Sequence, residues 1–229
     1  MTDAIDPRAA AFAAVEAGDA AALRDLLVRF PALAGASGED GVSLILRARY
    51  AFRLDLVDML LAADPELDLF TAAALGRTER VAALLAADPA QVGAVAGDGF
   101  TPLHLAAFFA APETVLCLLE RGAAIECVSR NALAVRPLHA AAAGGSPAVV
   151  ELLIAHGADP NSRQHGGWTA LAAAAANGSV GMVRVLLACG ARAALAADDG
   201  KTPLDHARER DYLEIARWLT ARAPAWPRP

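Results

Sequence analysis

The stretch DGFTPLHLAAFFA, residues 98–110, contains the start of a helix and determines how the rest of the sequence is interpreted. Thr101 is a suitable N-cap, because its hydroxyl can accept a hydrogen bond from a free amide of the first turn. Pro102 suits the first helical position, where a missing N–H costs nothing. The stretch therefore predicts a short helix over about 102–109, with Leu103 pointing inward.

The same pattern returns further along the chain. The counterparts of Thr101-Pro-Leu-His104 begin at positions 136, 169 and 202, and each is followed by small residues and then by a leucine-rich run. The leucine-rich runs also recur, less regularly, in the N-terminal half. Together they give seven units that begin near 9, 43, 67, 101, 136, 169 and 202. A period of this length is typical of solenoid proteins.

Four segments between residues 98 and 206 resemble ankyrin repeats: DGFTPLHLAA, RGAAIECVSRN, HGADPNSRQHGGWTAL and DDGKTPLDHA. The resemblance implies that each unit forms a short helix, a tight turn, a longer helix and an extended finger. Units one to three match less closely. Unit two departs most, with Arg47 and Arg49 where small residues are usual and Phe52 where a glycine is expected.

The expected fold is an all-α ankyrin-repeat solenoid of about seven stacked helix-turn-helix units with short β-hairpin-like fingers. One unit cannot bury both sides of its longer helix, so neighbouring units must stack. We expect a single domain over residues 1–222 and a proline-rich tail at 223–229. Three glycines are expected to end the longer helices, namely Gly122, Gly157 and Gly190.

His104 and His139 occupy equivalent positions in units four and five. We expect the His104 ring to hydrogen-bond the backbone and the hydroxyl of Thr101, which ties one unit to the next. His139 has Arg136 in place of the threonine, so the same role is expected with an altered partner. The alternative for His104 is a ligand or a general base.

No arrangement of residues predicts catalysis, a cofactor or a metal. His156, Asp159 and His165 are the candidates for a metal set, but they fall at a helix end and on a finger, which favours a solvated turn. The sequence has no phosphate-binding loop and no dinucleotide fingerprint. Three cysteines are too few and too scattered for a disulfide framework.

Composition limits the partners and the compartment. A net charge of −6 argues against nucleic acid and anionic membrane surfaces. The sequence shows no membrane-spanning run and no secretory signal, so a cytoplasmic monomer is expected. The 20 basic residues include a single lysine, Lys201, which is typical of GC-rich coding, and we expect a bacterial source.

The remaining candidate is the concave face that the resemblance implies, formed by the short helices and the fingers. Its outward positions lie just before the turn between the helices and just before the Thr101-like position. The hypothesis for partner binding names these residues and a polar rim: Tyr50, Phe100, Phe108, Phe109, Val135, Arg136, His165, Trp168 and Asn177. An exposed row of large apolar side chains would mark a binding site. The alternative is that Phe108 and Phe109 cover the shortened connection between units two and three, or pack within the stack.

The resemblance and the absent catalytic residues favour non-catalytic binding of another protein by an adaptor or inhibitor. Two alternatives stay open. One is an accessory subunit that stabilises a single enzyme, and the other is a small enzyme with an active site in the groove.

Overall fold

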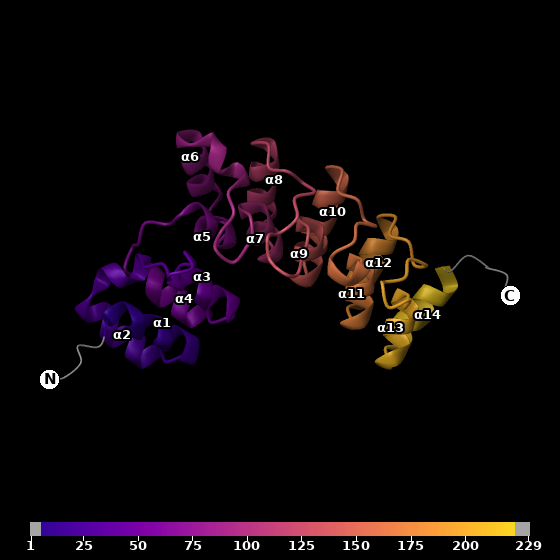
Figure 1. Ribbon diagram of the computed structural model, residues 1–229, viewed down its shortest axis with the longest axis horizontal. Coiled ribbons are helices and arrows are strands. Elements are labelled where there is room, and N and C mark those ends of the chain that lie inside the picture. Colours follow the sequence, from indigo (N-terminus) through magenta and orange to yellow (C-terminus); the bar gives the residue numbers. More distant parts are fainter. Residues whose placement is uncertain (1–5, 223–229) are drawn as a thin grey trace.

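The computed structural model describes residues 6–222, which form a row of seven helix pairs (Figure 1). The first helices of the pairs are α1 (Pro7–Ala17), α3 (Leu44–Tyr50), α5 (Leu69–Ala74), α7 (Pro102–Phe108), α9 (Pro137–Ala143), α11 (Ala170–Ala176) and α13 (Pro203–Glu209). The second helices are α2 (Ala20–Arg29), α4 (Leu54–Leu61), α6 (Thr78–Ala87), α8 (Pro112–Glu120), α10 (Pro147–Ala155), α12 (Val180–Ala188) and α14 (Leu213–Arg222). The all-α solenoid expected from the repeats is confirmed.

The connections between pairs are the fingers, except for the short connection between the second and third pairs. Three of them contain a short 3-10 helix, at Pro31–Gly35, Pro89–Gly93 and His165–Gly167. Two fingers are closed by a single antiparallel bridge, between Ser37 and Ser43 and between Arg163 and Thr169. Within residues 6–222 no extended strand forms, so the hairpin-like character of the fingers is limited to these contacts.

Helix α7 begins as the sequence predicts. The Thr101 side chain accepts a hydrogen bond from the His104 amide, and Pro102 occupies the first turn. Leu103 is fully buried. The helix ends at Phe108, one residue before the predicted end, because Phe109 is the C-cap.

The turn between the two helices of a pair requires a backbone with positive φ. Glycine supplies it in four pairs, at Gly18, Gly76, Gly145 and Gly178, with φ between 65° and 74°. The other three pairs use Phe52, Ala110 and Asp211, with φ of 54°, 59° and 58°. Units two and four lack the glycine of the repeat pattern, but Phe52 and Ala110 adopt the same turn geometry. The cost is steric, because a residue with a side chain is held in the left-handed region.

The stack is interrupted between the second and third pairs. Only residues 62–68 join α4 to α5, too few to form a finger. The first helices α3 and α5 still pack against each other, but α6 lies away from α4 and continues the row with α8 and α10 (Figure 1). Accordingly, the buried side chains of pairs one and two form one cluster, and those of pairs three to seven form another.

A third cluster bridges this interruption. It consists of Val42, Leu46, Ala74, Leu105 and Phe109, with Tyr50, Phe70, Phe100 and Phe108 packed against it. The fingers before pairs two and four also meet directly, since a Cβ added to Gly97 would lie 1.5 Å from the carbonyl oxygen of Asp40. Aromatic side chains and adjoining fingers thus hold the two halves together where a regular finger is missing.

Two glycines with ordinary backbone angles give a first prediction. A Cβ at Gly144 would lie 1.9 Å from the carbonyl oxygen of Phe108, which belongs to the end of α7. Gly144→Ala must push α9 away from α7, and we expect it to lower the free energy of unfolding by about 2 kcal/mol. Gly181 in α12 has no neighbour within 4 Å of an added Cβ. Gly181→Ala is therefore the matched control, and we expect it to raise that free energy by about 0.5 kcal/mol.

Urea unfolding of both variants, followed by circular dichroism, checks this prediction. Equal effects of the two substitutions would contradict the close approach of α7 and α9.

Candidate functional site

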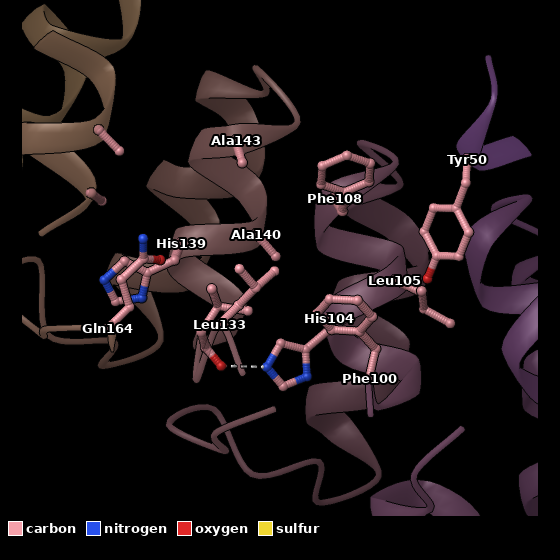
Figure 2. A pocket seen from close by; sticks show the side chains of 13 residues that line it. Tyr50, Phe100, His104, Leu105, Phe108, Leu133, His139, Ala140, Ala143 and Gln164 are labelled. Atoms are coloured by element: carbon pink, nitrogen blue, oxygen red, sulfur yellow. Dashed lines mark hydrogen bonds between the residues drawn. The ribbon is translucent and has the colours of Figure 1, made fainter. Parts of the chain in front are cut away.

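The row of helix pairs curves, with α6, α8 and α10 on its outer side and α5, α7 and α9 on its inner side (Figure 1). A pocket of about 330 Å³ opens on this inner face. It is lined by Tyr50, Phe100, His104, Leu105, Phe108, Leu133, Val135, His139, Ala140, Ala143, Gln164, Ala170 and Ala173 (Figure 2). We call it the inner-face pocket. Its lining contains no Asp, Glu, Lys or Arg.

The pocket exists because side-chain size changes along the row. At two equivalent positions of the first helices, α7 carries Leu105 and Phe108, whereas α9 carries Ala140 and Ala143. Helix α11 continues with Ala173. The small side chains of α9 and α11 form the floor of the pocket, and the larger side chains of α7 form the wall beside it.

Tyr50 completes the aromatic wall of the pocket from the second helix pair. Its ring centroid lies 5.6 Å from that of Phe109, and Phe108 meets Phe109 edge to face at 5.0 Å. The Tyr50 hydroxyl donates a hydrogen bond of 2.6 Å to Oδ2 of Asp98. Burial, followed by this hydrogen bond, raises the pKa of Tyr50, so the phenol stays neutral. A residue from the N-terminal side of the interruption thus helps to build a pocket on the other side.

His104 makes the hydrogen bonds expected from its sequence position. Its Nδ1 accepts from the Thr101 amide at 3.3 Å and lies 2.8 Å from the Thr101 hydroxyl. Its Nε2 lies 3.0 Å from the carbonyl oxygen of Val135 on the next finger. Since Nδ1 accepts from an amide, Nε2 carries the proton and donates. Burial lowers the pKa of this ring, so its role is to join two units rather than to exchange protons with a ligand.

His139 repeats the arrangement one unit later. Nδ1 accepts from the Arg136 amide at 3.3 Å, and Nε2 lies 3.1 Å from the carbonyl oxygen of Ser162. Burial is the largest effect and lowers the pKa of His139 to about 4; the hydrogen bond to Ser162 opposes it, and the positive charge of Arg136 adds to it. At His104 the Nδ1 atom lies beside both the amide and the hydroxyl of Thr101. At His139 the corresponding partner of Nδ1 is only the Arg136 amide, which is the altered partner expected from the sequence.

Of the nine residues in the partner-binding hypothesis, the structure brings four together in the pocket: Tyr50, Phe100, Phe108 and Val135. Phe109 is buried. It is 8% exposed and packs under Tyr50 and the guanidinium of Arg49, whose Cζ lies 4.7 Å from the ring centroid. The expectation that Phe109 is exposed is wrong, and the alternative of packing within the stack holds for this residue.

The other four residues lie outside the pocket. Arg136 is half-buried, with Nε 2.9 Å from Oε2 of Glu126. Trp168 stacks on the buried ring of His206 at a centroid distance of 4.2 Å. His165 and Asn177 are exposed. Partner binding by these four residues stays a prediction, with Arg136 and His165 as its polar rim.

Sequence reasoning missed seven residues of the pocket: Leu105, Leu133, Ala140, Ala143, Gln164, Ala170 and Ala173. A signal for the floor was present, because aligning the units shows the change from Leu105 and Phe108 to alanine. The finger residues carry no comparable signal.

Among residues 6–222, no three His, Cys, Asp or Glu side chains lie together as metal ligands would. His156 Nδ1 lies 2.8 Å from the carbonyl oxygen of Leu152, and Asp159 Oδ1 accepts from the amide of Asn161 at 2.9 Å. In the same described part of the chain, no helix has the length and apolar character to cross a membrane. The tail at 223–229, expected to be proline-rich and separate, lies outside the described residues.

Stacked helix pairs with a groove on the inner side define a repeat solenoid. Two family models of ankyrin repeats match the sequence, one of three copies over residues 136–225 and one of many copies over residues 69–119. The chain belongs to the ankyrin-repeat family. These repeats indicate a protein-interaction module.

Several curated proteins are similar to parts of the chain. The B-cell lymphoma 3 protein homolog of Mus musculus is 37% identical over 132 residues, which is 58% of this chain and 29% of that protein. Rabankyrin-5 of Mus musculus is 44% identical over 61 residues, 27% of this chain and 5% of that protein. The probable E3 ubiquitin-protein ligase XBOS31 of Oryza sativa subsp. japonica is 40% identical over 95 residues, 41% of this chain and 21% of that protein.

The matches thus span less than a third of each of these relatives. The relatives are eukaryotic, and the bacterial origin inferred from the arginine content stays a prediction.

Proposed function

We propose that the protein binds a protein partner through its inner face and finger tips, without catalysis, as a cytoplasmic monomer that serves as an adaptor or inhibitor. The observation that supports this most is the inner-face pocket, an apolar hollow whose histidines already hydrogen-bond inside the protein. Apolar pockets with aromatic walls are where binding energy concentrates in protein interfaces. Because the groove is formed by packed helices, little ordering is needed on binding.

The experiment compares two faces of the same protein. Arg130 and His165 are exposed on neighbouring fingers, whereas Glu120 and Glu151 are exposed on the outer helices α8 and α10. The double variant Arg130→Glu with His165→Glu should reduce capture of partner proteins from the native host at least about tenfold, an effect of the size of an interface hot spot. Glu120→Arg with Glu151→Arg should leave capture unchanged.

Both double variants should melt like the wild type, since the four side chains are exposed. Loss of capture only in the outer-helix variant would overturn the assignment to the inner face. Co-elution of one enzyme at fixed stoichiometry would favour the accessory-subunit alternative over a transient adaptor.

A further inference from the structure

The polar atoms of the inner-face pocket are largely committed to other parts of the protein. The two histidine Nε2 atoms point to finger carbonyls, and the Tyr50 hydroxyl points to Asp98 (Figure 2 shows the His104 bond). The side-chain amide of Gln164 differs, because within residues 6–222 no hydrogen bond engages it. A ligand would therefore meet apolar surface and one available amide.

Two arginines that neighbour lining residues in sequence are paired with carboxylates, and the guanidinium of Arg49, next to Tyr50, lies over the Phe109 ring with Cζ 4.7 Å from its centroid. Arg136 Nε lies 2.9 Å from Oε2 of Glu126, and Arg163 Nη2 lies 3.1 Å from Oδ1 of Asp198. The Asp98 carboxylate accepts from Tyr50 and from the amide of Phe100. A charged ligand would lose its hydration in the pocket, and the lining itself offers no opposite charge in return.

We propose that the inner-face pocket receives one large nonpolar side chain of the protein partner, with Phe or Trp bound ahead of Leu, and that the Gln164 amide hydrogen-bonds the partner's backbone beside it. This inference rests on the proposed function and names the chemistry of the partner. The wall of Tyr50, Phe100 and Phe108 favours an aromatic occupant, because rings pack edge to face.

The uncharged lining of the pocket favours a nonpolar side chain over a charged small metabolite. A fatty acid offers a similar apolar chain but carries a carboxylate, for which the lining holds no cation. A nonpolar side chain of a protein brings no charge, and the backbone amide groups beside it suit Gln164. The rim also fits a protein partner, since Leu133 on the finger is 58% exposed.

The test uses four small probes and the protein labelled with ¹³C at Leu and Val methyl groups. N-acetyl-L-phenylalaninamide and N-acetyl-L-tryptophanamide are neutral mimics of the proposed anchor. N-acetyl-L-lysinamide carries a positive charge, and octanoate carries a negative one. We expect saturable shifts of the Leu105, Leu133 and Val135 methyl signals with the two aromatic amides, and at least tenfold weaker binding of the two charged probes.

Variants locate the binding site. Ala143→Phe places in α9 the side chain that α7 has at the equivalent position, and it should weaken binding of the aromatic amides at least tenfold. Ala173→Leu fills the same floor from α11 and serves as a second variant should the first change the fold, which circular dichroism and melting report. Ala155→Phe, on the exposed side of α10, is the matched control and should bind like the wild type. Gln164→Ala should weaken binding about fivefold, as expected for one hydrogen bond.

Two results would overturn the inference. Octanoate binding as tightly as the aromatic amides would identify an anionic, lipid-like ligand instead. Shifts confined to signals outside the pocket, or no saturable shift at all, would show that the pocket is not a binding site. Neither result depends on capture by the finger tips, so failure of this inference is distinguishable from failure of the proposed function.

Discussion

Phe109→Ala should lower the free energy of unfolding by about 3 kcal/mol, the low end of what removal of a buried aromatic ring costs. The ring is 8% exposed and belongs to the cluster that bridges the interruption between pairs two and three. Its removal deprives Tyr50 and Arg49 of their packing surface and leaves a cavity between the two halves of the stack. Urea unfolding monitored by circular dichroism measures the loss.

Phe52→Ala is the matched control, since Phe52 is 69% exposed and close to the same cluster, with its ring centroid 6.5 Å from that of Phe108. We expect its effect to stay within about 0.5 kcal/mol. Unchanged stability of Phe109→Ala, together with lost partner binding, would instead place Phe109 on the binding surface.

The repeat period was sufficient to predict the helix pairs, because each unit contains its own start, turn and stop. Thr101 and Pro102 start α7, and Gly145 and Gly157 supply the positive φ that ends α9 and α10. The hydrogen bonds of His104 were predictable for the same reason, since its partners recur one unit away. These features depend only on residues within one unit and on contacts with the next unit.

Phe109 was misplaced because its position was inferred from a regular unit. The equivalent residues Gly144 and Asn177 are exposed. At Phe109 the missing finger between pairs two and three leaves space that the ring fills, and Arg49 and Tyr50 of unit two cover it. The wall of the pocket has the same origin, since it joins residues of pairs two and four. Side-chain contacts across an irregular step cannot be obtained from a repeat alignment.

Acid should destabilise the protein through its buried histidines. The pKa of His139 is lowered from 6.5 to about 4 in the folded state, chiefly by burial. At pH 7 the ring is neutral in both states, and the stability is fully present. Below pH 6.5 the His139 ring binds a proton in the unfolded chain but not in the folded chain. The free energy of unfolding therefore falls until about pH 4. Each pH unit in this window costs about 1.4 kcal/mol, so the loss from His139 reaches about 3 kcal/mol, and the lowered pKa of His104 adds to it.

The contribution of His139 is isolated by urea unfolding of His139→Gln at several pH values between 7 and 4. This variant should be less stable than the wild type at pH 7, because it loses the bond to Ser162, but its loss of stability on acidification should be smaller by about 3 kcal/mol. His165→Gln, at an exposed position, should retain the wild-type pH dependence. Parallel curves for the wild type and His139→Gln would mean that the folded ring takes up its proton at the same pH as the unfolded chain, in conflict with the donor and acceptor roles assigned to its two nitrogens. Below that pH, His139 would then join the units by a different hydrogen-bond pattern, with both ring nitrogens as donors.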